Sequence, residues 1–313
     1  MTAPIVLFVY NRPDHTKKTI EALSNNKASS DSNLFIFSDG PKTISDKVAV
    51  DEVRNCLKNI TGFKSVNIIE RAENIGLANN VIQGVTEIVQ TYGKVIVLED
   101  DIVASPVFIE YMNSLLSNFE SRTDIFSVTG YNFPSTTMKI PNNYKEDLYL
   151  SYRAMSWGWG TWKDRWQKVD WNVRDFQTLK NDKIKINQFN KGGDDLFPML
   201  QRQMLGEINS WAIRFCYAHF VNKSYCIYPV KPYVKNIGFD GSGVHCNSKS
   251  GYKYYSDILA ADLPAVNKNI EPNEHIFKAF HFVYGNSFLT KVIKLMRLMN
   301  RQILMTFTKK QTF

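Results

Sequence analysis

The sequence predicts an α/β protein with a mostly parallel, doubly wound sheet and helices on both faces. Short apolar segments alternate with helix-like segments through the first hundred residues, an order typical of such sheets. Each apolar segment also ends in polar residues, and ligands of these folds bind at the carboxyl ends of the strands. Of the 313 residues, 44% are hydrophobic and 22% are charged, so the chain can bury a large core.

Four buried strands are expected in the first half of the chain. Their segments are short, continuous apolar runs, which is the pattern of strands covered on both faces. They occupy residues 4–10, 34–37, 66–69 and 95–98. The second half lacks a regular alternation of strands and helices, and we expect strands there over residues 125–130 and 147–152.

Three helices are expected between the first four strands. Asp14 stands where an N-cap residue belongs and predicts a helix over residues 16–23. Apolar residues at helical spacing predict further helices over residues 48–57 and 77–92. Residues 175–208 have a weaker helical pattern.

The chain is expected to form one domain over residues 1–275, followed by a basic segment over residues 276–313. No linker-like change of composition and no internal repeat separates residues 1–132 from 133–275, so these are two halves of one domain. Seven of the 38 Lys and Arg residues, but none of the 30 Asp and Glu residues, follow Glu274. The preceding residues therefore have a net charge of about +1, which argues against a nucleic-acid-binding protein.

Residues 288–307 predict a basic amphipathic helix. Its basic residues follow a spacing that places them on one helix face: Lys291, Lys294, Arg297 and Arg301. Such a helix can lie on an anionic membrane surface, or it can pack on the domain with its basic face in solvent. Both interpretations are open.

The N-terminal apolar run over residues 4–10 is too short for the core and cleavage site of a signal peptide. No uninterrupted apolar run reaches the roughly 18 residues that a membrane-spanning helix needs. We therefore expect a cytoplasmic protein, peripheral on the inner face of the plasma membrane if the basic helix binds lipid. The four cysteines have no metal-binding or redox spacing, and reduced thiols are expected in that compartment.

The strongest candidate site is the acidic triplet Glu99-Asp100-Asp101, which directly follows the fourth expected strand. Three adjacent carboxylates repel one another, and a cation can neutralise them. Mg²⁺ and Mn²⁺ prefer oxygen ligands and often bind one or two carboxylates together with phosphate oxygens. We expect Asp101 to ligate the metal directly, with Asp100 or Glu99 contacting a ribose or a bound water. The alternative is a solvent-exposed turn or a helix N-cap, either of which can have the same acidic sequence.

Polar residues after the other strands are candidate nucleotide contacts. Asp39 can accept hydrogen bonds from a base or ribose, and Gly40 permits close approach of a ligand. Residues 74–80 precede a helix whose start can face a phosphate. The candidates in that segment are Asn74, Gly76 and Asn80. Arg12 is a candidate contact to the diphosphate or the base. The alternative for Asp39-Gly40 is a plain turn, and the alternative for residues 74–80 is a capping loop.

Taken in order, four motifs resemble those of glycosyltransferases of the GT-A fold. The similarity is greatest to bacterial, family-2-like sugar transferases related to eukaryotic N-acetylglucosaminyltransferase I. The motifs are Tyr10-Asn11-Arg12-Pro13, Ser38-Asp39-Gly40, Asn74-Ile75-Gly76-Leu77 and Leu98-Glu99-Asp100-Asp101. Further matches occupy residues 127–132, 156–162, 210–214 and 236–243, so the resemblance covers about residues 4–250.

The resemblance implies a nucleotide-sugar donor, usually a UDP-sugar, a divalent metal, and transfer with inversion at the anomeric carbon. It also implies that residues 1–132 hold the nucleotide and residues 133–275 the acceptor. Tyr10 is a candidate donor contact through its place in the first motif. The acceptor is expected to be a glycan or lipid-linked glycan of a bacterial surface polysaccharide.

Inversion requires a base that deprotonates the acceptor hydroxyl while the metal stabilises the departing diphosphate. In the related eukaryotic enzymes an Asp lies just before a Trp that corresponds to Trp211, but here no Asp precedes this Trp closely. Glu207 is therefore the first candidate base, followed by Asp195 and Asp194. An exposed position on a helix is the alternative for Glu207.

Five of the six tryptophans lie between residues 157 and 171, and aromatic rings suit the C–H faces of sugars. Trp157 and Trp159 are candidates for binding the donor sugar, with Gly158 allowing close approach. Core packing is the expected role of the other three.

Three polar residues near the end of the domain are further candidates. His245 is a candidate ligand of the metal or the diphosphate, and Asp240 and Ser242 are candidate contacts to phosphate or acceptor. Structural roles are the alternative for all three.

Two other functions remain open. A sugar nucleotidyltransferase would also need acids and a metal, but the segment after the first strand lacks a Gly-rich and basic triphosphate loop. A non-catalytic glycan-binding scaffold would explain the absence of an Asp just before Trp211.

Overall fold

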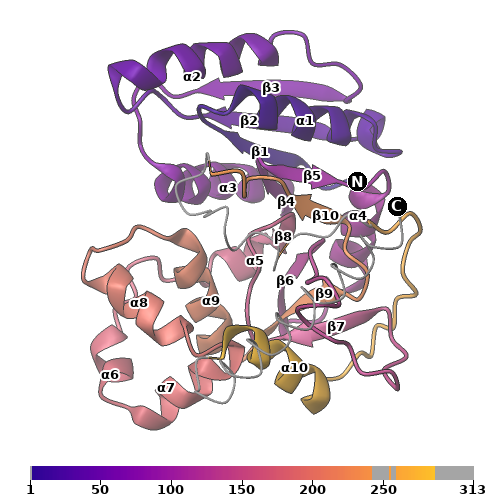
Figure 1. Ribbon diagram of the computed structural model, residues 1–313, viewed down its shortest axis with the longest axis vertical. Coiled ribbons are helices and arrows are strands. Elements are labelled where there is room, and N and C mark those ends of the chain that lie inside the picture. The colour runs from indigo at the N-terminus through magenta and orange to yellow at the C-terminus, as the bar shows by residue number, and fades with distance from the viewer. Residues whose placement is uncertain (1, 242–253, 255–258, 286–313) are drawn as a thin grey trace, which may run out of the picture.

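A single mixed sheet runs through the protein in the computed structural model, which describes residues 2–241, 254 and 259–285 (Figure 1). Within those residues the sheet has eight strands in the order β3-β2-β1-β4-β8-β6-β9-β7. The strands are β1 (Ile5–Val9), β2 (Asn33–Ser38), β3 (Ser65–Glu70), β4 (Lys94–Glu99), β6 (Ile125–Thr129), β7 (Leu148–Ser151), β8 (Trp159–Trp162) and β9 (Tyr225–Pro229). A separate antiparallel ribbon pairs β5 (Ile102–Ala104) with β10 (Val234–Asn236).

The first four strands form the parallel half that the sequence predicts. In β1, Leu7 lies opposite Ile36 of β2 on one side and Leu98 of β4 on the other. The pairing of β6 with β9 is also parallel, whereas the pairings that involve β8 or β7 are antiparallel. The connections in the first half are α1 (Pro13–Ser24), α2 (Ile44–Leu57) and α3 (Leu77–Tyr92). The predicted α/β class, with a mostly parallel Rossmann-like sheet, is therefore confirmed.

Two of these helices begin earlier than their apolar pattern indicated. α1 starts at Pro13, because the missing N–H of proline needs no partner in the first turn. Asp14 consequently lies inside the first turn and does not cap the helix. α2 is preceded by Thr43, whose hydroxyl accepts from the backbone N of Asp46 at 3.3 Å in a capping box. Caps and prolines thus decide where these helices begin.

Helices cover both faces of the sheet, so that neighbouring side chains of β1 enter two separate cores. Ile5 and Leu7 pack in a core with α1, α2 and α4 (Phe108–Asn118). Val6 and Phe8 pack in the other core, with α3 and α9 (Trp211–Val221). Burial on both faces explains why β1 is continuously apolar instead of alternating.

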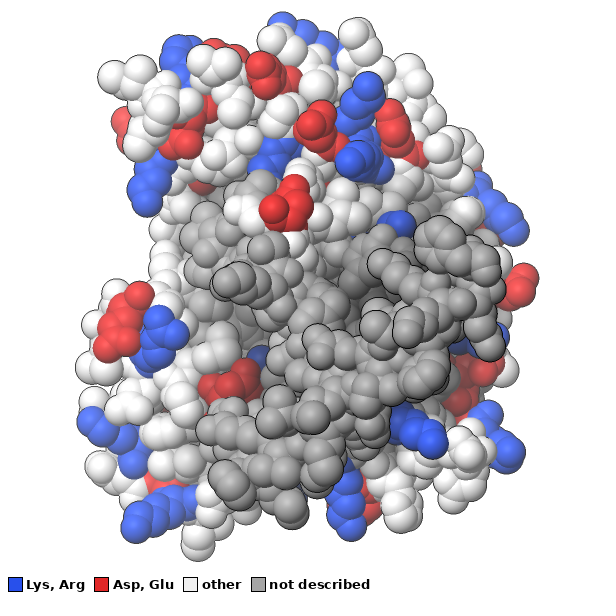
Figure 2. All heavy atoms as spheres, viewed as in Figure 1, with Lys and Arg blue, Asp and Glu red and all other residues white. Residues whose placement is uncertain are grey.

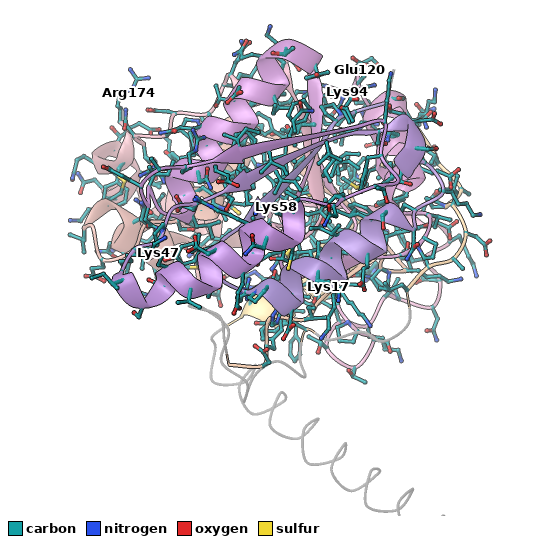
Figure 3. All side chains as sticks on the ribbon, turned by 90° about the horizontal axis from the view of Figure 1, so that it is seen from above. Lys17, Lys47, Lys58, Lys94, Glu120 and Arg174 are labelled. Atoms are coloured by element: carbon teal, nitrogen blue, oxygen red, sulfur yellow. The ribbon has the colours of Figure 1, made fainter. Side chains whose placement is uncertain are left out.

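Charged side chains lie on the outer faces of the covering helices. Figure 3 shows α1 and α2 side by side over one face of the sheet, and Lys17 on α1 and Lys47 on α2 are exposed. On the face shown in Figure 2, basic and acidic side chains are interspersed over the residues that are coloured. In the part of the chain that the structure describes, no helix is both long and apolar enough to span a membrane.

The region over residues 175–208 forms three short helices in place of one long helix. They are α6 (Phe176–Lys180), α7 (Lys183–Phe189) and α8 (Leu196–Met204). Asp182 starts the second of these, since its carboxylate accepts from the backbone N of Ile184 and Lys185 at 3.0 Å. Together with α5 (Lys163–Trp166) and α9 they form a helical lobe below the parallel half in Figure 1.

A stack of aromatic rings forms the core between this lobe and the sheet. Trp159 on β8 is fully buried, with its ring centroid 4.9 Å from that of Trp211 and 5.8 Å from that of Trp166. Trp162 is also buried, and its Nε1 donates to the carbonyl oxygen of Leu116 at 2.8 Å. Large aromatic side chains in this arrangement contribute much of the buried apolar area of the lobe.

The residues that begin the basic C-terminal segment pack on the domain. α10 (Glu274–Tyr284) buries Ile276 in the core that contains α1 and α4. The guanidinium of Arg153 lies 3.8 Å from the centre of the Tyr284 ring, a cation–π contact. The basic helix expected over residues 288–307 lies outside the described residues.

His219 is expected to make the stability of the fold depend on pH. Its ring is buried on α9, and its Nδ1 donates to the carbonyl oxygen of Phe215 at 2.8 Å, so Nε2 accepts from Ser127 Oγ at 2.7 Å. Burial lowers the pKa of His219 to about 4. The unfolded chain, with a His pKa of about 6.5, then binds more protons than the folded protein between these two pKa values. The contribution of His219 to the free energy of unfolding should therefore fall, by up to about 3 kcal/mol, as pH decreases through this window, whereas the raised pKa values of Glu99 and Asp100 act in the opposite direction.

Urea unfolding at pH 7.5 and pH 4.5 measures this effect. Relative to the wild type, His219→Gln should gain up to about 3 kcal/mol in the change of unfolding free energy from pH 7.5 to pH 4.5, whereas the same substitution at the exposed His275 should leave this change as in the wild type. The same pH dependence in His219→Gln as in the wild type would contradict the assignment.

Candidate functional site

The carboxyl ends of the parallel strands bring the predicted polar residues to one edge of the sheet. Val9 lies opposite Ser38 in the next strand, and Phe8 lies opposite Glu99 at the end of β4. Arg12 follows Val9 by three residues, Asp39 directly follows Ser38, and Asp100 and Asp101 directly follow Glu99. Residues from three loops thus lie at one edge of the sheet.

Arg12 forms ion pairs with two residues of the acidic triplet. Its Nη2 bonds to Asp100 Oδ1 and lies 3.0 Å from Asp101 Oδ2, and its Nε lies 3.4 Å from Asp100 Oδ2. The side chains are 17%, 6% and 8% exposed, so water screens these charges only weakly. Burial lowers the pKa of Arg12, but the attraction of the two carboxylates outweighs burial and raises it.

The triplet carries more negative charge than Arg12 neutralises. Burial raises the pKa of Asp100 to about 6, although Arg12 opposes this shift. Burial and then repulsion by Asp101 and Asp100 raise the pKa of Glu99 to about 8. A carboxyl group with this pKa holds its proton at neutral pH unless a further cation approaches.

The carboxylates of the triplet fit a metal ion that is also coordinated by a bound ligand. They do not supply a complete set of protein ligands. In the described ranges, no three His, Cys, Asp or Glu side chains are grouped as metal ligands. Mg²⁺ and Mn²⁺, however, can bind through one or two carboxylates together with phosphates and water. Arg12 engages both oxygens of Asp100, which leaves Asp101 and Glu99 as the available ligands. The other predicted ligand, His245, and the nearby Ser242 lie outside the described residues.

Gly238, to which the sequence analysis gave no role, supports this group from the second half of the chain. The backbone N of Ile237 donates to the carbonyl oxygen of Asp101 at 2.9 Å, and the N of Gly238 donates to Asn236 Oδ1 at 2.7 Å. A Cβ at position 238 would overlap Asp101 Oδ2 and would lie 3.0 Å from Arg12 Nη1. Any other residue at this position would have to displace the Asp101 carboxylate from its place beside Arg12.

Asp39 joins the loops that follow β2 and β3. Its Oδ1 accepts from the backbone N of Ile75 and its Oδ2 from that of Gly76, both at 3.0 Å. Asn74 Nδ2 donates back to the carbonyl oxygen of Gly40 at 2.8 Å. A Cβ on Gly40 would lie 2.5 Å from the backbone of Glu73, so this glycine serves the contact between the two loops. Asp39 therefore holds together the loops that follow β2 and β3, which form the rim of the site.

Tyr10 and Asn80 bond to residues next to the loops that Asp39 joins. The hydroxyl of Tyr10 accepts from the backbone N of Lys42 at 3.0 Å, and burial raises its pKa. Asn80 is buried, and its Oδ1 accepts from Arg71 Nε at 3.3 Å. Asn80 thus supports the loop from inside, while Tyr10 keeps part of its surface open to solvent.

The two tryptophans that were predicted to bind the donor sugar differ in their burial. Trp157 is half-buried, and its ring meets that of Tyr131 edge-on at 4.6 Å between centroids. Trp159 is fully enclosed in the aromatic core, so the prediction that it binds sugar is corrected: its ring has no face left for a ligand. Gly158 has φ of 55°, and a Cβ there would lie 2.8 Å from Val234 Cγ1, so this glycine is required by its backbone and by packing.

The candidate bases are engaged elsewhere in the described residues. Asp195 forms a two-pronged ion pair with Arg153, at 2.8 Å to Nη1 and 2.9 Å to Nη2. Asp194 lies 3.2 Å from His281 Nε2 on α10. Glu207 is exposed in the turn after α8 and pairs with Arg202 at 3.2 Å. None of the ion pairs described for these acids reaches the Arg12 group.

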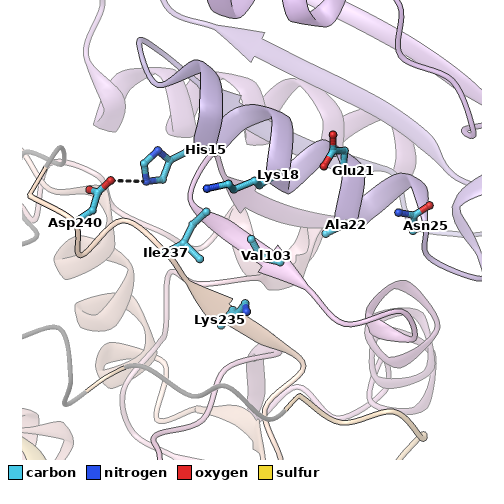
Figure 4. A pocket seen from close by; sticks show the side chains of 9 residues that line it. All are labelled: His15, Lys18, Glu21, Ala22, Asn25, Val103, Lys235, Ile237 and Asp240. Atoms are coloured by element: carbon cyan, nitrogen blue, oxygen red, sulfur yellow. Dashed lines mark ion pairs between the residues drawn. The ribbon is translucent and has the colours of Figure 1, made fainter.

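Asp240 follows Gly238 by two residues and pairs with the first turn of α1 (Figure 4). Its Oδ2 is 3.2 Å from Nε2 of His15, a residue in the first turn of α1. This contact places Asp240 beside the start of α1, close to the loop that carries Arg12.

No protein-family model matches the chain. No curated protein sequence matches it either. Among solved structures the chain is similar to S. aureus TarS, with a TM-score of 0.38 and 10% identity, over 75% of this chain and 36% of that one. It is also similar to a UDP-glucose pyrophosphorylase solved in complex with UDP-glucose, with a TM-score of 0.37 and 11% identity, over 72% of this chain and 90% of that one. Neither likeness carries the assignment of function, which depends on the site itself.

Gly238→Ala should strain the ion pair between Arg12 and Asp101. We expect this substitution to lower the free energy of unfolding by roughly 1–3 kcal/mol, because the added methyl overlaps a carboxylate oxygen. In an Asp101→Ala background the overlapped oxygen is gone, and the cost should shrink by about 1 kcal/mol or more. Urea unfolding of the four proteins in this double-mutant cycle measures the difference. Equal costs in both backgrounds would refute the contact.

Asp195→Asn should reveal a structural role of that carboxylate. The substitution leaves the mostly buried Arg153 without a charged partner, and we expect a loss of roughly 3 kcal/mol in the free energy of unfolding. Glu207→Gln removes only an exposed ion pair and should leave the melting temperature unchanged. Thermal unfolding followed by circular dichroism compares the two variants, and equal melting temperatures would refute the structural role of Asp195.

Proposed function

We propose that the chain is a metal-dependent, inverting glycosyltransferase that moves a sugar from a nucleotide-sugar, with a UDP-sugar favoured, to a glycan or lipid-linked glycan. The observation that carries this proposal is the group of Glu99, Asp100, Asp101 and Arg12 at the carboxyl end of β4. Open α/β sheets bind their ligands at this edge, and carboxylates with excess negative charge suit a metal bound together with phosphates. The ordered motifs that resemble GT-A glycosyltransferases support the same reaction.

The metal would be held by Asp101, with Glu99 next to it. Mn²⁺ or Mg²⁺, when bound, supplies positive charge that stabilises the departing nucleoside diphosphate. Arg12 is a fixed cation beside the same place, and it orients the carboxylates through its bonds to Asp100 and Asp101. The protein thereby provides a preorganised electrostatic environment for a leaving group that gains negative charge.

Binding of the nucleoside is assigned to the rim, and the donor sugar contact and the catalytic base are assigned to the second half of the chain. Tyr10 and the loops joined by Asp39 would hold the nucleoside. The half-buried ring of Trp157 would lie against a sugar, since an aromatic face suits its C–H groups. Glu207 remains the candidate base, because its carboxylate is exposed and bound only by another exposed side chain.

Calorimetric titration with UDP and with GDP, each in Mn²⁺ and in EDTA, tests the donor site. We expect Mn²⁺-dependent binding of UDP, and a loss of at least about tenfold in affinity for Asp101→Ala because a metal ligand is removed. Asp51→Ala removes an exposed carboxylate on α2 and is the matched control, with wild-type affinity expected.

Failure of the wild type to bind either nucleotide would overturn the proposal and favour a glycan-binding scaffold. Incubation with UTP and a sugar 1-phosphate tests for a nucleotidyltransferase, since only that enzyme would release pyrophosphate from this mixture. Hydrolysis or transfer of a UDP-sugar without pyrophosphate formation would support the glycosyltransferase.

A further inference from the structure

The two edges of the main sheet differ in how well the chain covers them. At one edge lies β7, whose residues Leu148–Ser151 are all buried. At the other edge lies β3 (Figure 1), where Asn67, Ile68 and Glu70 are exposed. Among the strands that the structure describes, β3 pairs only with β2. One side of β3 therefore faces away from the sheet.

Alternate residues of β3 direct their backbone hydrogen-bonding groups to this outer side. Arg71 follows the residue that is paired with Ser38, and its N–H donates to the carbonyl oxygen of Ser38 at 2.9 Å. In this ladder the odd-numbered residues bond to β2. The N–H and C=O groups of Val66, Ile68 and Glu70 therefore point outward, as on any edge strand.

β3 has none of the features that keep an edge strand from pairing with another chain. Natural proteins protect exposed edges with prolines, bulges or charges within the strand. No proline and no charged residue lies within residues 65–69, and the register with β2 is regular over the whole strand. Charged side chains stand only at its ends, Lys64 and Glu70.

The sequence of β3 is complementary to itself when a second copy runs antiparallel. With Lys64 of one copy opposite Glu70 of the other, Val66 lies opposite Ile68, and a two-fold axis repeats both pairs. Residues directly opposite one another point to the same face of a sheet, so an ion pair and an apolar pair form on each side of the axis. A shift of the register by two residues would bring Lys64 opposite Ile68 or Ala72 and remove the ion pairs.

The backbone and the charges at the ends are compatible with this register. Val66 and Ile68 both direct their backbone groups outward, so the two opposed residues can exchange both hydrogen bonds. The N–H of Lys64 already donates to the carbonyl oxygen of Ser32 at 3.0 Å, so Lys64 would meet a partner through its side chain. Glu70 lies 3.5 Å from Arg54 of its own chain, but its side chain is 48% exposed, and a carboxylate can accept from more than one donor.

We propose that two copies of this chain form a dimer by antiparallel pairing of β3, which continues the main sheet across the interface. The two-fold axis reverses the strand direction in the second copy. The two Arg12 groups consequently lie at opposite edges of the joined sheet, away from the paired strands. This inference does not depend on the proposed glycosyltransferase function.

Sedimentation velocity of the full chain from about 1 to 100 μM tests the dimer, because a dimer of micromolar affinity dissociates in this range. We expect the wild type to dimerise. Lys64→Glu should weaken association by about tenfold or more, since it sets like charges opposite each other at both ends of the paired strands. Lys17→Glu is the matched control: it makes the same change of charge at an exposed position on α1 (Figure 3) and should leave association as in the wild type.

A charge exchange between the two ends of β3 tests the register. Glu70→Lys alone should also weaken association, but an equimolar mixture of this variant with Lys64→Glu should recover it, because the mixed dimer again pairs a carboxylate with an ammonium at both ends. Recovery in the mixture also shows that the single variants are folded. A monomeric wild type over the whole range, unchanged association of Lys64→Glu, or no recovery in the mixture would overturn the proposal.

Discussion

The ion pair between Arg12 and the two aspartates after β4 is the interaction on which the site depends. Three carboxylates at the end of one buried strand would repel one another, and Arg12 from the end of β1 offsets this repulsion at close range. The same contact fixes the loop before α1 against the end of β4. Thr19 adds a hydrogen bond from α1 to the carbonyl oxygen of Asp100 at 2.7 Å. Burial, and after it the remaining repulsion by Asp101 and Asp100, raises the pKa of Glu99.

The rest of the edge is built to keep this group in place. Gly238 lets the segment after β10 pack on Asp101, which joins the second half of the chain to the first. Asp39 holds two loops by accepting backbone hydrogen bonds, so the rim is rigid before any ligand binds. Such preorganisation matters for a site that must stabilise developing charge, because fixed groups need not reorient during the reaction.

The helical lobe is stabilised by different interactions. Its centre is the aromatic stack around Trp159, and its border with α10 is held by the Arg153–Asp195 ion pair and by the ring of Tyr284. These contacts use residues that the sequence suggested for sugar binding and for catalysis.

The sequence by itself determined the α/β class, the four parallel strands and the edge where the polar residues gather. Continuous apolar runs report burial on both faces of a strand, and parallel strands place their carboxyl ends together, so local patterns sufficed for this part. Only the tertiary structure decided the partners of the individual side chains. Arg12 lies 88 positions before Asp100, and Trp159 meets Trp211 from another element, so neither contact is encoded in a local pattern. The sequence suggested Asp195 as a candidate catalytic base. In the folded chain it is a structural residue, because Arg153 lies next to it and pairs with its carboxylate.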